Sequence, residues 1–130
     1  MAEQNQCSCQ GSLKLVFSCS GAADTAEIGD RAARRIHRTG EARMYCLAGV
    51  GGDVEMIVNN SRAAGRILVI DGCDTDCAAK LLRKAGFRTF EHLRVTDLGF
   101  EKGGSPAVEP AIEKIAGAAL GLLRKADAPA

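Results

Sequence analysis

Runs rich in apolar residues recur along the chain, separated by longer stretches with the period of a helix. The first three runs occupy 13–18, 42–47 and 66–70, and a shorter, more polar run follows at 92–96. Each run is followed within three residues by a glycine. Apolar runs of this length predict strands that are buried on both faces, as in a parallel sheet.

Helical spacing appears between these runs. Ile28, Ala32 and Ile36, for example, stand four residues apart and would share one helix face. Four helices are predicted, at 22–38, 53–64, 74–85 and 108–125. Strands that alternate with helices predict an α/β fold with an open, mostly parallel four-stranded sheet and helices on both faces. This is the three-layer arrangement of flavodoxin-like and Rossmann-like proteins, for which we expect the strand order 2-1-3 at the start of the sheet.

Composition narrows the class further. The chain of 130 residues is long enough for one self-sufficient core, so we expect a single domain at 13–125 and a disordered tail at 1–12. A net charge of +1, no tryptophan and one tyrosine argue against a nucleic-acid partner. The N-terminus has no signal-peptide pattern and no apolar run would span a bilayer, so we expect a cytoplasmic protein without a membrane partner.

Cysteines are the most informative residues of the chain. There are six, and four of them follow a common rule. Cys19 follows the first strand, Cys46 ends the second, Cys73 follows the third, and Cys77 begins the next helix one turn later. All four are therefore expected at the carboxyl edge of the sheet, where open α/β sheets bind ligands. Four cysteines that served only as small buried side chains would be scattered among strands and helices.

The expected geometry suits a metal ion. Neighbouring strands lie about 4.8 Å apart, and the sulfurs of a tetrahedral zinc site lie roughly 3.8 Å apart. Helix N-termini near the strand tips favour the thiolate form and donate hydrogen bonds to sulfur. In a reducing cytoplasm, clustered cysteines bind metal or carry out thiol chemistry more often than they form disulfides.

Four stretches of the sequence resemble the DGC-domain family of zinc-binding proteins. They are CSG at 19–21, MYCLAGVGG at 44–52, LVIDGCDTDCA at 68–78 and VTDLGFEKG at 95–103. The resemblance covers roughly residues 13 to 115. It implies that Cys19, Cys46, Cys73 and Cys77 are the ligands of a zinc ion. A proline often follows the Asp-Gly-Cys stretch in the family, where this chain has Asp74.

Two other chemistries remain open. Cys73 and Cys77 could be the nucleophile and resolving thiol of a thiol-redox or sulfur-transfer enzyme. The four thiolates could instead hold an iron–sulfur cluster or a soft metal such as Cu(I). A zinc site would serve metal delivery, sensing or thiol-ligand exchange, and delivery or sulfur transfer would require a protein partner. The sequence leaves open whether the protein is an enzyme.

Several residues are weaker candidates. Asp97 and Asp71 follow strands at the same edge and could orient the site or simply cap a turn. His37 and His92 are expected to be solvated or packed rather than ligands. The glycine-rich turn at 48–52 precedes a helix and could hold an anion, but it lacks a nucleotide-binding pattern.

Two further features have simple readings. The arginines at 31, 34, 35 and 38 are expected to form a solvated helix face. Cys7 and Cys9 could capture a metal, but as part of the expected tail they are set apart from the site.

Overall fold

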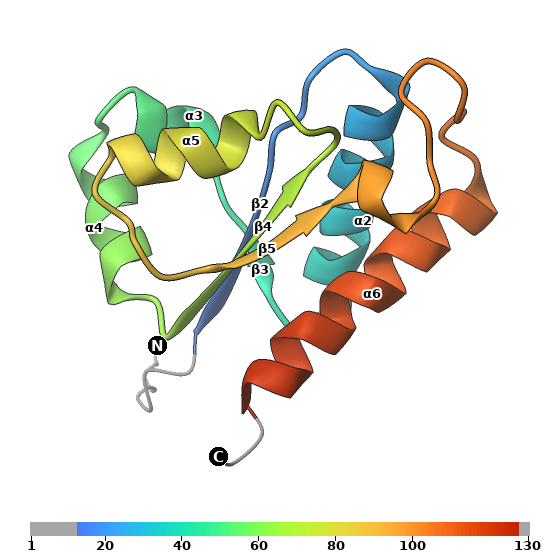
Figure 1. Cartoon of the computed structure of the whole chain (residues 1–130). Coiled ribbons are helices and arrows are strands. Elements are labelled where there is room, and N and C mark those ends of the chain that lie inside the picture. Colours follow the sequence, from blue (N-terminus) through green and yellow to red (C-terminus); the bar gives the residue numbers. More distant parts are fainter. Residues whose placement is uncertain (1–12, 128–130) are drawn as a thin grey trace.

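The computed structural model describes residues 13–127, and the tail expected at 1–12, with Cys7 and Cys9, lies outside this range. The described chain runs in alternating strands and helices (Figure 1). The strands are β2 (Lys14–Ser18), β3 (Arg43–Met44), β4 (Arg66–Asp71) and β5 (Glu91–Arg94). The helices are α2 (Asp24–Thr39), α3 (Leu47–Gly51), α4 (Glu55–Ala63), α5 (Cys77–Lys84) and α6 (Glu109–Asp127), with a 3-10 turn η2 (Val95–Leu98).

The four strands form one parallel sheet in the order β3-β2-β4-β5. The predicted α/β class and the order of the first three strands are therefore confirmed. In Figure 1, α2 and α6 cover one face of the sheet, and α3, α4 and α5 cover the other. Leu15 pairs with Ile67 and Ser18 with Ile70, so β2 and β4 end side by side.

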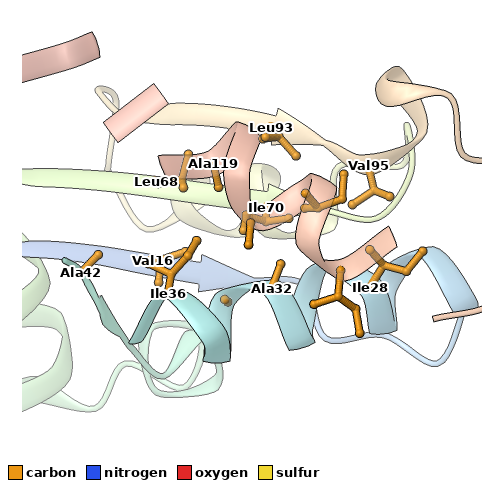
Figure 2. Packing of buried hydrophobic residues seen from close by; sticks show 14 of the residues in the cluster. Val16, Ile28, Ala32, Ile36, Ala42, Leu68, Ile70, Leu93, Val95 and Ala119 are labelled. Atoms are coloured by element: carbon orange, nitrogen blue, oxygen red, sulfur yellow. The ribbon is translucent and has the colours of Figure 1, made fainter. Parts of the chain in front are cut away.

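Side chains of successive strand residues enter opposite halves of the core, as the pleat requires. Val16, Leu68 and Ile70 pack against α2 and α6 (Figure 2). Phe17 and Val69 pack on the other face, toward α3 and α5. The continuous apolar runs of the sequence therefore report a sheet that is covered on both sides.

Three local predictions need correction. The second strand, expected at 42–47, is only two residues long, and the expected glycine-rich turn at 48–52 is mostly the short helix α3. The fourth strand ends at Arg94 rather than at 96, because the chain turns into η2. Within residues 13–127, no helix combines the length and apolar character needed to cross a membrane.

Candidate functional site

A pocket of about 240 Å³ opens at the carboxyl edge of the sheet, and we call it the cysteine pocket. It lies among the ends of β2 and β4, the start of α2 and the loop after η2. Its lining residues are Cys19, Gly21, Ala22, Ala23, Ala26, Asp71, Gly72, Cys73, Thr75, Asp76, Cys77 and Lys102. Three of the four expected cysteines therefore share one pocket, and all four are free thiols.

Cys19 is fixed by the end of the sheet. Its backbone N–H donates to the Ile70 carbonyl at 3.1 Å, one step beyond the last paired residues of β2 and β4. Its Sγ accepts the N–H of Gly72 at 3.4 Å. This contact ties the Cys19 side chain to the turn that follows β4.

Gly72 is required by a close approach of two backbones. A Cβ at this position would lie 2.6 Å from the Ala26 nitrogen, in the first turn of α2. Contacts of that length do not occur between real atoms of this kind, so any side chain would push the turn away from α2. The glycine thus allows the turn between β4 and α5 to reach the pocket.

Cys73 has the most polar surroundings of the pocket thiols. Its Sγ lies 3.5 Å from the Thr75 hydroxyl oxygen and 3.6 Å from Lys102 Nζ. Hydrogen bonds from Thr75 are the main cause that lowers the pKa of the Cys73 thiol below its usual value, and the positive charge of Lys102 adds to this effect. Cys73 is therefore the pocket thiol with the clearest tendency to ionise.

The loop that carries Lys102 is tied to the start of α2. The Asp24 carboxylate accepts the N–H groups of Gly103 at 2.8 Å and Ser105 at 2.9 Å. These hydrogen bonds hold the pKa of Asp24 below its usual value. An ionised Asp24 thus keeps Lys102 beside Cys73.

Cys77 is the first residue of α5, and the carboxylates of Asp71 and Asp76 both lie at this end of the helix. Asp71, with 1% of its surface exposed, accepts the N–H groups of Ala78 and Ala79 at 2.8 and 3.1 Å. Asp76 precedes Cys77 and is bound by both ends of the Arg94 guanidinium at 2.9 and 2.6 Å. This arginine holds the pKa of Asp76 below its usual value.

Cys46 lies apart from the other three. It is exposed, caps the N-terminus of α3, and its Sγ accepts the N–H of Gly49 at 3.3 Å. Its place follows from the short strand: β3 ends at Met44, where Met44 pairs with Val16, and two residues later Cys46 already caps α3. The cysteine pocket does not include it among its lining residues.

The side chains as they stand do not form a four-sulfur cage. Within residues 13–127, the only group of at least three His, Cys, Asp or Glu ligand atoms within 4.8 Å of one another belongs to Asp71, Asp76 and His92. These three are satisfied by protein groups, since the helix α5 N–H groups bind Asp71 and Arg94 binds Asp76. The cysteines supply the donors that zinc prefers, but the sulfurs of Cys19, Cys73 and Cys77 do not form such a group either. A shared ion therefore requires all four cysteine side chains to move closer together. Zinc binding by the four cysteines stays a prediction.

Sequence reasoning missed the contributions of β5. His92, expected to be solvated or packed, places its Nε2 at 2.9 Å from the buried Asp71. The sequence pattern had suggested no role for Arg94. The alternation His92-Leu93-Arg94 was the available signal, because Leu93 is buried and the two polar residues must then share the opposite face.

The other weak candidates have ordinary partners. Asp97 lies 3.3 Å from Arg94, and His37 accepts the Met44 N–H at 3.0 Å, far from the pocket lining. Arg31 and Arg34 pair with acidic residues one turn earlier in α2, at 2.8 Å each. Such pairs are typical of a solvated helix face.

Comparisons with known proteins identify a matching family and a relative. The model of the DGC domain family matches residues 15–119. The chain is also 37% identical over 90 residues to the anaerobic and virulence modulator AnvM of Pseudomonas aeruginosa, an alignment that covers 69% of each protein. No solved structure matches the chain.

Proposed function

The chain belongs to the DGC domain family, and from this premise we propose that it binds zinc through Cys19, Cys46, Cys73 and Cys77. The observation that carries the proposal is the cysteine pocket, which gathers three of these thiols at the ligand-binding edge of an open α/β sheet. When bound, zinc would supply a Lewis-acidic centre whose thiolate ligands can exchange.

Hydrogen-bond donors to sulfur support this proposal. Four thiolates around one Zn²⁺ carry a net negative charge, which the surrounding protein must stabilise. The Gly72 N–H donates to Cys19, the Gly49 N–H to Cys46, and the Lys102 ammonium to Cys73. Donors at these positions would offset the negative charge of thiolate ligands around a bound metal.

The separate position of Cys46 favours a regulatory role for the metal over a purely structural one. The fold has a buried core on each side of the sheet and does not need a metal to supply one. Three ligands in one pocket and a fourth, exposed ligand at the start of a short glycine-containing helix suit an ion that can be gained and released. The modulator role in the name of the relative AnvM agrees with sensing or delivery, each of which would involve a protein partner.

Elemental analysis and an absorption spectrum test the proposal directly. The protein should be purified untagged, without oxygen or added metal. One zinc per chain and no visible colour are expected. Iron with a brown absorption band would overturn zinc in favour of a cluster, and a copper signal would assign a soft metal instead.

Substitution of Cys46 tests the four-ligand assignment. Cys46→Ser should lower zinc occupancy and reduce the thermal stability of the zinc-loaded protein. The double substitution Cys7→Ser and Cys9→Ser is the matched control, because it also removes thiols and should leave occupancy unchanged. Full occupancy in Cys46→Ser, or a loss in the control, would contradict the assignment.

A second candidate function is thiol exchange at Cys73, favoured by its contacts with Thr75 and Lys102. The Cys73 thiolate would attack one sulfur of a substrate disulfide, forming a mixed disulfide and releasing the other substrate sulfur as a thiolate. The Cys77 thiolate would then attack Cys73, forming the Cys73–Cys77 disulfide and releasing the second substrate thiolate. Two electrons would thus pass to the substrate.

Alkylation by iodoacetamide separates the two candidates. Zinc-bound thiolates should be protected until a chelator is added, whereas a free redox pair should react at once near neutral pH. Absence of metal together with rapid reaction at Cys73 would favour thiol exchange and overturn the zinc proposal.

A further inference from the structure

Residues 71–77, which we call the cysteine turn, are anchored by side chains of the neighbouring strand β5. Asp76 has φ of 55°, in the left-handed region that residues other than glycine rarely adopt. Although it occupies the N-cap position of α5, its side chain makes no cap hydrogen bond. Both carboxylate oxygens instead bind Arg94, at 2.9 and 2.6 Å.

Asp71, at the other end of the turn, caps the N-terminus of α5 instead. Its two oxygens accept the first free N–H groups of α5, from Ala78 and Ala79. His92 Nε2 lies 2.9 Å from Asp71 Oδ2. Cys77 therefore lies between two anchored parts of the chain. Asp76, which Arg94 binds, precedes it, and the N–H groups that the buried Asp71 binds follow it.

Cys73 is coupled to the same anchors. The Asp76 N–H donates to the Cys73 carbonyl at 3.2 Å, so the left-handed residue also closes the turn that carries Cys73. Asp71 and Asp76 both line the cysteine pocket, whereas His92 and Arg94 do not. The two β5 residues thus contact the pocket lining through these carboxylates.

We propose that Arg94 and His92 are positioning residues that set the placement of Cys73 and Cys77, Arg94 by holding Asp76 in its left-handed conformation and His92 by orienting Asp71. The metal readout of this proposal rests on the proposed zinc function, whereas its thiol readout does not. Outer residues that orient metal ligands typically contribute about 10- to 100-fold to metal affinity.

The test compares two arginines with similar contacts. Arg94→Gln removes the fork on Asp76. Arg124→Gln removes a similar fork on Glu41, where the N–O distances are 3.1, 2.9 and 2.6 Å, in a part of the chain that does not line the pocket. Folding of both variants is checked by circular dichroism and thermal unfolding.

In metal-loaded protein, zinc affinity is measured by competition with a chelator, and Co²⁺ substitution reports the ligand geometry through the thiolate absorption bands. Arg94→Gln should lower zinc affinity by about 10- to 100-fold and change the Co²⁺ spectrum, whereas Arg124→Gln should change neither. Equal losses in the two variants would overturn the proposal, because general destabilisation would then explain them.

In metal-free protein, the alkylation rates of Cys73 and Cys77 are measured separately by peptide mass. Arg94→Gln should change the ratio of the two rates, and Arg124→Gln should leave it as in the wild type. An unchanged ratio in Arg94→Gln overturns the positioning role even if zinc binds. If the wild type binds no zinc but the ratio changes, the zinc function fails and the positioning role stands.

Two further variants keep the test decisive. If Arg94→Gln does not fold, Arg94→Lys retains the charge without the two-pronged contact and should show a smaller change of the same sign. Asp76→Gly places at this position a residue that adopts positive φ readily. Combined with Arg94→Gln, it should restore part of the wild-type alkylation ratio, and no restoration would contradict the role of backbone conformation.

Discussion

The cysteine turn and the segment around Cys46 differ in how firmly the fold holds them. The cysteine turn carries Cys73 and Cys77. It is fixed by the buried carboxylate of Asp71, by the close approach of Gly72 to α2 and by the two hydrogen bonds from Arg94 to Asp76. Cys46, which is exposed like Cys77, begins a helix of five residues that contains two glycines. The difference indicates that the backbone is firmly held on one side of the candidate site and less constrained on the other.

The contrast has a physical origin in the sheet. The cysteine turn follows a central strand, β4, with neighbours on both sides, whereas β3 is a two-residue edge strand with one neighbour. Polar anchors can reach β4 from β5, whereas within residues 13–127 no strand pairs with the outer edge of β3. Fewer contacts around an element permit local opening at a lower free-energy cost.

Gly72→Ala should give the largest effect, because the new methyl group would collide with the backbone of α2 at Ala26. We expect the free energy of unfolding to fall by about 3 kcal/mol, at the upper end for overpacking, together with weakened zinc binding. Urea denaturation is the measurement. Gly117→Ala is the matched control, since a Cβ there meets nothing within 4 Å and should stabilise α6 by about 0.5–1 kcal/mol. A neutral Gly72→Ala would show that the cysteine turn is less firmly held than its contacts imply.

Asp71→Asn should be the next most damaging change. The amide keeps one acceptor but turns N–H donors toward the N–H groups at the head of α5, which Asp71 now binds. Loss of a buried acceptor costs about 1–3 kcal/mol, and chemical denaturation of the metal-free protein should reveal it. Asp97→Asn, at an exposed carboxylate that contacts Arg94 from η2, should stay within about 0.5 kcal/mol. Similar losses for both would remove the special role of Asp71.

Thr75→Val should act on reactivity rather than on stability. Hydrogen bonds from Thr75 are the main cause that lowers the pKa of Cys73, so losing the hydroxyl should raise that pKa. The thiolate fraction at neutral pH then falls, and the pH profile of Cys73 alkylation in metal-free protein should move to higher pH. Lys102→Met should move it in the same direction by less. The rate at Cys77 in the same samples is the internal control, and an unmoved Cys73 profile would contradict the assigned cause.

Cys46→Ser should give the smallest effect in metal-free protein. The serine oxygen can still accept the Gly49 N–H, and the site is exposed, so the unfolding free energy should change by less than about 0.5 kcal/mol. Thermal unfolding without metal is the measurement. A large loss would show that Cys46 is part of a rigid region and would remove the contrast with the cysteine turn.

Much of the fold could be predicted because it depends on local patterns. The apolar runs gave the buried parallel strands, and the sheet order of the first three strands followed from the rules for α/β units. Element ends were less accurate, since β3 ends at Met44 and the chain already begins α3 after Cys46. The helix α3 was missed because glycine-rich segments favour turns.

For the candidate site, the sequence alone determined which residue types follow each strand, and therefore that Cys19, Cys73 and Cys77 would meet at the carboxyl edge. Only the tertiary structure decided that Cys46 lies outside the pocket lining, because β3 ends at Met44 and Cys46 caps α3 instead of following a longer strand. It also decided that Asp24 holds the loop of Lys102, and that β5 supplies Arg94 and His92 to the cysteine turn. These contacts join residues far apart in the chain, and no local pattern carries their geometry.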